Sequence, residues 1–178
     1  MGTDDDVKFF DAENLNLPAF DLSGSLPPGV HDSSFSNFAQ ATAFNIERIK
    51  MWRQLVSFLA LPMLTGKFSY AYIGGDFVST KASPDQIAVL LETRMPYGPE
   101  ALAAVAEFFA VGIVRYELVY GINLHFHLRG APPELFDGPF SELKGGKDPA
   151  FYSKVGLARL QLNGVDSLVV VRSSIRGD

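Results

Sequence analysis

Apolar residues recur at three- and four-residue steps between Thr42 and Leu61, and charged or polar residues fill the positions between them. This spacing follows the 3.6-residue period of an α-helix that buries one face. We therefore expect an amphipathic helix over Thr42–Leu61, ended by Pro62, because proline cannot continue a helix. Its buried face is predicted to carry Phe44, Ile49, Trp52, Leu55, Val56 and Leu59.

A run of alternating apolar residues starts at Phe68 and breaks at Gly74 and Gly75. A polar stretch follows, and a second apolar run over Asp85–Leu91 is expected to lie beside the first. Two adjacent glycines permit backbone angles that other residues avoid. The pattern predicts a strand, a glycine turn and a second strand, a layout on which phosphate-binding sites are built, although glycine turns are common in any mixed fold.

Two further elements follow in the second half of the chain. Proline in a first turn and an alanine-rich composition predict a short helix over Pro99–Ala110. Strict alternation over Ile122–Leu128 predicts a strand that is apolar on one side. The other side of this strand carries Asn123, His125 and His127.

The C-terminal part begins with a segment rich in proline and glycine that predicts a long loop. Lys144 and Lys147 flank two glycines there, so the loop could hold an anion or be a solvated connection. Apolar runs over Val155–Leu162 and Ser167–Arg172 surround an Asn-Gly step, which predicts a β-hairpin. The sheet is therefore expected to end in an antiparallel pair.

The N-terminal region divides into an arm, residues 1–25, and the start of a single domain over residues 26–178. Scattered aromatic residues suggest that the arm packs onto the domain or onto a partner. A Pro-Pro pair keeps the next segment extended, and Asp32 or Ser33 is expected to cap a short helix. We expect His31 to make a structural hydrogen bond. The short helix carries Phe35 and Phe38.

Composition narrows the class of protein. The chain has 178 residues, 47% of them hydrophobic and 20% charged, as in a globular protein with one core. A formal net charge of −5 weighs against a nucleic-acid partner, since phosphate-backbone binding needs a basic surface. The chain has no cysteine, no basic signal-like N-terminus and no apolar run of membrane-spanning length, so we expect a cytoplasmic protein without a membrane partner.

The two histidines of the alternating strand form the first candidate site. His125 and His127 lie two residues apart on one side of a strand, and imidazole nitrogens are common metal ligands. No cysteine exists and spacing supplies no third ligand. The competing interpretation is a polar strand face that lines a cleft or faces solvent.

A family resemblance follows from two motifs. LPPGVH at Leu26–His31, followed by the amphipathic helix and GGDFVSTKASPDQIAV, resembles short bacterial nucleotidyltransferase-like proteins. Their central motif reads approximately Gly-Ser-Phe-Val-Thr, then Lys, then Pro-Gly-Asp-Ile-Asp-Val. The element order also looks like the minimal nucleotidyltransferase fold of the polymerase-β superfamily over most of Leu26–Leu162. The resemblance implies an α+β (α/β-type) fold: a central mixed β-sheet with helices mainly on one face.

The sequence departs from the motif of the resembled family at the positions that are catalytic in that family. Gly75 matches the motif glycine, but Asp76 stands where the family has serine. Gln86 and Ala88 replace the two aspartates of Asp-Ile-Asp, and Asn123 aligns with the third carboxylate of the superfamily. The matching positions are Phe77, Val78, Lys81 and Pro84.

These replacements decide the functional expectation. Nucleotidyl transfer needs two magnesium ions, which require hard anionic oxygen ligands. Amide side chains offer only a neutral carbonyl, and alanine offers no ligand. The leading hypothesis is therefore an inactive nucleotidyltransferase-like protein that needs no cofactor and binds another protein in an immunity, antitoxin or regulatory role.

Two alternatives stay open at the sequence level. In the first, a rearranged site binds magnesium and a nucleoside triphosphate, with Asp76 and Asp85 near the metal. Phosphate contacts would then come from Lys81, Lys144 and Lys147. In register, Asp85 would point to the opposite face of the strand from Gln86, which weighs against this arrangement. The second alternative is a metal-binding cleft that uses the His125 and His127 strand.

Overall fold

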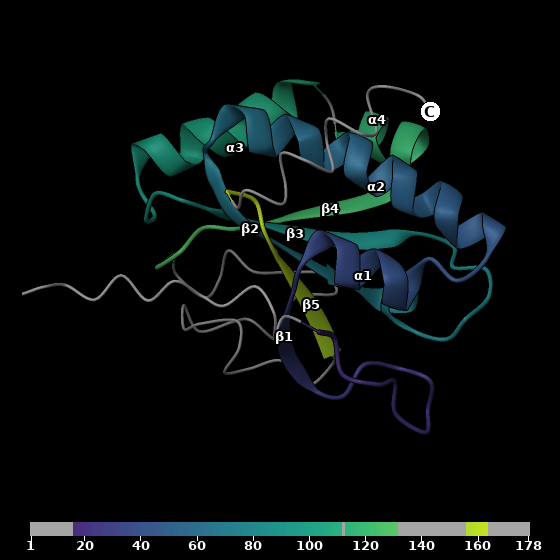
Figure 1. Ribbon diagram of the computed structural model, residues 1–178. Helices are drawn as coiled ribbons and strands as arrows, with labels where there is room; N and C mark the ends of the chain where they lie inside the picture. Colours follow the sequence, from purple (N-terminus) through teal and green to yellow (C-terminus); the bar gives the residue numbers. More distant parts are fainter. Residues whose placement is uncertain (1–15, 112, 132–155, 164–178) are drawn as a thin grey trace, which may run out of the picture.

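The computed structural model describes residues 16–111, 113–131 and 156–163 (Figure 1). Over these residues the chain alternates between strands and helices in an order close to that expected from the sequence. The elements are β1 (Gly29–Ser33), α1 (Phe35–Thr42), α2 (Ile46–Thr65), β2 (Phe68–Gly74), the 3-10 helix η2 (Gly75–Val78), β3 (Ile87–Thr93), α3 (Pro99–Val111), α4 (Ile113–Tyr120), β4 (Ile122–His127) and β5 (Gly156–Gln161).

The strands form one mixed sheet in the order β1-β5-β2-β3-β4. β2 is antiparallel to both β3 and β5, whereas β1 with β5 and β3 with β4 form parallel pairs. The helices α3 and α4 make the crossover that a parallel β3–β4 pair requires. The fold is α+β with a mixed sheet, as the sequence predicted.

The main core lies between one face of the sheet and the helices (Figure 1). Ala71 and Ile73 of β2 contribute to it together with Phe38 of α1, Phe58 of α2 and Phe108 of α3, all of them at most 5% exposed. Side chains alternate along a strand, so Tyr72 and Leu90 lie on the opposite face, in a second and smaller cluster. The helices α1 to α4 thus share a core on one face of the sheet.

The region predicted as one helix from Thr42 is divided between two. Thr42 ends α1, and α2 begins only at Ile46, because the side chain of Asn45 accepts the backbone N–H of Arg48 and caps the new helix. Phe44 therefore lies between the helices and is half exposed rather than buried. The cap of α1 is Ser34, whereas the predicted caps Asp32 and Ser33 belong to β1.

Pro62 does not end α2, contrary to the sequence prediction. It lies inside the helix, which continues to Thr65 and ends at Gly66, a residue with the left-handed φ of 65°. Proline removes one backbone donor, but only three helical residues follow it here, and its ring is buried in the core. The packing of the ring compensates for the missing hydrogen bond.

The strands β2, β3 and β4 are present where the sequence predicted them, with β3 running from Ile87 to Thr93 and buried at every position. The helix α4 was not predicted, because its period was hidden beside the clearer alternation of β4. The expected C-terminal antiparallel pair is wrong for the described sheet: both of its edges are parallel pairs, and β5 lies inside it. The predicted second strand, Ser167–Arg172, lies outside the described residues.

Parts of the N-terminal arm pack as expected. Leu17 and Phe20 are partly buried against the main core, while residues 1–15 lie outside the described part of the chain. His31 makes the expected structural contact, with its Nε2 2.8 Å from the carbonyl oxygen of Pro27. Among the described helices, none has the length and apolar character needed to cross a membrane.

Candidate functional site

The turn after β2 depends on one glycine. Gly75 has a φ of 72°, in the left-handed region where a residue with a Cβ is strained, whereas Gly74 is extended. A Cβ on Gly75 would approach only the Cβ of Ala88, at an ordinary 3.7 Å. The backbone angle, rather than lack of space, therefore requires glycine here, and the turn leads directly into η2.

A cavity of about 350 Å³ opens beside this turn. Ala88 of β3 lies opposite Asn123 of β4 in the parallel register, and this pairing brings both residues to the cavity. The structure thus assembles the degenerate positions that the sequence comparison selected. The lining consists of Gly75, Asp76, Asp85, Gln86, Ala88 and Asn123.

The two carboxylates of this cavity share one ammonium group. Lys81 Nζ lies 2.6 Å from Asp76 Oδ2 and 2.9 Å from Asp85 Oδ2. The hydrogen bond to Asp76, followed by that to Asp85, raises the pKa of Lys81, so the ammonium stays charged over the physiological range. All three side chains are exposed, and Asp85 the most, at 86%.

The expectation that Asp85 points away from Gln86 is wrong. Both residues precede β3, which begins at Ile87, so the alternation of a strand does not apply to them. Asp85 and Gln86 line the same cavity and Asp85 joins Asp76 through Lys81. The loop before β3, rather than the strand, sets their direction.

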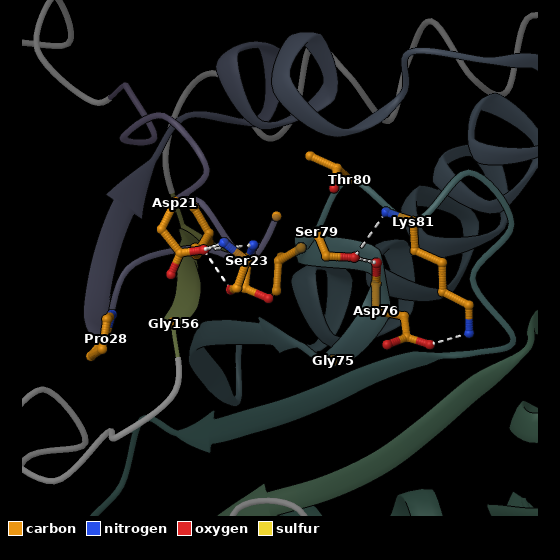
Figure 2. Close-up of a pocket in the computed structure, with 13 residues that line it drawn as sticks. Asp21, Ser23, Pro28, Gly75, Asp76, Ser79, Thr80, Lys81 and Gly156 are labelled. Carbon is orange, nitrogen blue, oxygen red and sulfur yellow. Dashed lines mark hydrogen bonds and ion pairs between the residues drawn. The ribbon is translucent and has the colours of Figure 1, made fainter.

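A larger cavity of about 720 Å³ lies on the other side of Asp76 (Figure 2). Figure 2 shows Asp21 and Ser23 on one side of it, and Asp76, Ser79 and Lys81 on the other. Asp21 Oδ1 accepts hydrogen bonds from Ser23 N at 2.8 Å and Ser23 Oγ at 2.5 Å. These bonds, that of the Ser23 side chain first, lower the pKa of Asp21.

The arm is therefore part of the site, which sequence reasoning missed. The N–H of Thr80 donates to the carbonyl of Gly24 at 2.7 Å, and Ser25 forms an isolated β-bridge with Ser79. Gly24 has a φ of 78°, in the region that favours glycine, and a Cβ there would lie 2.2 Å from Thr80 Oγ1, so the Thr80 side chain would have to rotate. The Gly-Ser dipeptide at 24–25, placed just before the Pro-Pro pair, was the one available signal.

A second residue that sequence reasoning missed is Arg48, which the helical pattern assigned to a polar face. Its guanidinium is fully buried and donates to three carbonyl oxygens, those of Thr42 and Lys81 at 2.5 Å each and that of Phe77. It also lies 4.5 Å from the ring centroid of Phe44. Burial lowers the pKa of Arg48, and Asp76 opposes that change.

The predicted polar face of β4 is not a solvent face. His127 is 2% exposed, and its Nδ1 lies 3.0 Å from Oε2 of the buried Glu92. Tyr72 donates its hydroxyl to the same oxygen at 2.9 Å, and Arg159 lies opposite Tyr72 in the register of β2 with β5. Arg159 in turn makes a bidentate ion pair with Asp32, at 2.6 and 2.8 Å.

These five side chains come from five different strands and follow the order of the sheet. The row crosses the sheet on the face opposite the main core, so it satisfies buried polar groups with one another. His127 is therefore a structural residue of this row. The described residues, His125 among them, contain no group of three or more His, Cys, Asp or Glu side chains that could hold a metal ion.

The remaining candidates, Lys144 and Lys147, lie outside the described residues. The residues that are described do not fit a pair of magnesium ions. Two carboxylates reach the smaller cavity, both bound to Lys81, and its other polar lining side chains are the amides of Gln86 and Asn123.

Comparison with known proteins gives one match. Residues 18–147 match the model of a family of unknown function, DUF6932. No curated protein and no solved structure matches the chain. The match includes the arm residues at the larger cavity, the glycine turn and both cavity-lining strands β3 and β4. The chain belongs to the DUF6932 family.

Proposed function

We propose that this chain is a catalytically inactive nucleotidyltransferase-like protein of the cytoplasm that acts by binding another protein. One observation carries the proposal: the positions where the resembled family has metal-binding carboxylates meet at one cavity and hold Gln86, Ala88 and Asn123. The site is assembled, but its ligands are replaced. An immunity, antitoxin or regulatory role fits a protein of this kind.

The electrostatics of the two cavities support the loss of nucleotide chemistry. Their charged lining side chains are Asp21, Asp76, Asp85 and Lys81, a formal charge of −2. A triphosphate would meet net repulsion there unless cations intervened. Asp76 also stands where the resembled family places a phosphate-contacting serine.

Exposed apolar residues beside the cleft support the binding role. Phe44 is 50% and Ile46 71% exposed, where α2 begins next to the loop that carries Lys81. Asn45, between them, donates to the carbonyl of Ala82 in that loop at 2.8 Å. An apolar rim beside a polar cleft is a common form of contact surface for a protein.

The test is capture of a partner from the native host, with cleft variants as the comparison. We expect a stable partner that is lost with Ile46→Asp and with Asp85→Arg. Leu118→Asp is the matched control, because Leu118 is an exposed apolar residue, at 81%, on α4 rather than at the start of α2 or in the loop that carries Lys81. Absence of any stable partner, or equal capture by all three variants, would contradict the proposal.

A second candidate function is nucleotide binding at a rearranged site with magnesium. The observation that favours it is the meeting of Asp76, Asp85 and Lys81 at two cavities that share Gly75 and Asp76 in their linings. Lys81 would have to leave both carboxylates to contact a phosphate, because its ammonium is engaged by them. Magnesium-dependent nucleotide binding that Lys81→Met abolishes would support this candidate.

A further inference from the structure

The start of α2 holds the loop that follows the glycine turn. Arg48 donates to the carbonyl of Phe77, in η2, and to the carbonyl of Lys81, in the segment between η2 and β3. Asn45 adds a third anchor through its bond to the carbonyl of Ala82. Two side chains from the N-cap and first turn of α2 thus hold three backbone carbonyls of a segment that lies about thirty residues further along the chain.

The guanidinium of Arg48 depends on this loop in return. It is 0% exposed, and within the described residues its hydrogen bonds go to carbonyl oxygens rather than to a carboxylate. A guanidinium remains charged in proteins, so burial is tolerated only where its N–H groups are satisfied. The rings of Phe44 and Phe77 cover its faces, with centroids at 4.5 and 5.0 Å.

Lys81 connects this clamp to the cleft. Its carbonyl is bound by Arg48, while its ammonium lies between the carboxylates of Asp76 and Asp85. The same residue is therefore fixed at the backbone from the helix side and reaches into the cleft with its side chain. The position of the ammonium follows from the position of the backbone that carries it.

We propose that Arg48 is the positioning residue of the cleft: by holding the Phe77 and Lys81 carbonyls, it places the Lys81 ammonium on Asp76 and Asp85. The two carboxylates of the cleft are thereby paired with a cation of their own chain. This role is independent of which ligand or partner the protein binds. Lysine cannot replace Arg48, because one ammonium lacks the planar fork that reaches three carbonyls at once.

The test measures the Lys81 side chain directly by NMR, in the full chain labelled with 15N and 13C lysine. The Hζ–Nζ signal of Lys81 is identified by its loss in Lys81→Arg. In the wild type, the two bonds to carboxylates slow the exchange of the Lys81 Hζ protons with water and keep this signal visible. We expect the signal to disappear in both Arg48→Gln and Arg48→Lys, because these protons then exchange faster. Arg53→Gln is the matched control, since Arg53 is an exposed arginine of the same helix.

A structural role alone gives a different result. Arg48→Gln would then lower the melting temperature but leave the Lys81 signal, measured well below that temperature, unchanged. That result would overturn the proposal. A Lys81 signal in Arg48→Lys equal to that of the wild type would also overturn it. If Arg48→Gln does not fold, Asn45→Asp decides by the same signal, because it keeps the oxygen that caps α2 and removes the donor to the Ala82 carbonyl. A weakened Lys81 signal supports positioning from α2, and an unchanged one refutes it.

Discussion

The row of polar side chains across the sheet makes a quantitative prediction at Tyr72. This residue is buried and its hydroxyl donates to Glu92, while Arg159 lies opposite it on β5. Tyr72→Phe keeps the ring and its packing but removes this hydrogen bond, so the buried carboxylate of Glu92 loses one partner. The substitution should therefore weaken the hydrogen bonding at the centre of the row without leaving a large cavity in the protein.

The magnitude follows from the burial of the pair. Tyr72 is 1% and Glu92 6% exposed, so little water can replace the lost bond. Hydrogen bonds to charged groups contribute about 1.5–3 kcal/mol. We expect Tyr72→Phe to lower the free energy of unfolding by about 2 kcal/mol, and the melting temperature by about 4–8 °C for a domain of this size.

The pH dependence of the Tyr72 effect has a definite sign. Burial, and then the charge of Glu92, raise the pKa of Tyr72 well above its ordinary value of 10.0. A raised pKa means that the stabilisation is fully present below about pH 10 and is lost as pH rises further, because the unfolded chain deprotonates first. The stability difference between wild type and Tyr72→Phe should therefore narrow above about pH 10.

The assay is urea unfolding followed by far-UV circular dichroism, at neutral pH and at several values above pH 10. Tyr97→Phe is the control, because Tyr97 is 43% exposed and its contact with Arg129 is made by the backbone. A loss below about 0.5 kcal/mol, the range of ordinary surface substitutions, would refute the buried row. So would a difference that stays constant with pH.

Three other substitutions test the turn, the core and the cleft. Gly75→Ala should lower the free energy of unfolding by about 1–2 kcal/mol through its left-handed φ, whereas Gly98→Ala, at ordinary φ, should change it little in the same urea titration. Phe38→Ala should cost about 3–5 kcal/mol, because Phe38 is fully buried against the Trp52 ring, and should shift the fluorescence of Trp52. Lys81→Met should leave the melting temperature unchanged, because its ion pairs are exposed.

Local pattern predicted much of the fold. β2 and β4 were readable from their alternation, β3 from a continuous apolar run, and α3 from its first-turn proline and alanine content, because each of these signals is local to one segment. The break between α1 and α2 was not, since Asn45 interrupts an apolar pattern that otherwise continues. The pairing of β1 with β5 joins residues such as Asp32 and Arg159, which are 127 positions apart, and no local signal reports such a contact.

The site was predicted in part for the same reason. Motif positions such as Gln86 and Asn123 do meet at one cavity, because the parallel register of β3 and β4 brings them together. The burial of Arg48 was missed because a charged residue in an amphipathic helix is assigned to solvent, and the partners of Glu92 were missed because they come from other strands. Both are buried, and their partners are backbone carbonyls or residues from other strands.

The most direct test of the central claim is calorimetric titration of the full chain with ATP, GTP, CTP and UTP, each with magnesium or manganese. The proposal predicts no binding heat with any of them, because the cleft lacks metal-binding carboxylates at Gln86, Ala88 and Asn123 and carries a net negative charge. Micromolar, metal-dependent binding that is abolished in Lys81→Met would contradict it.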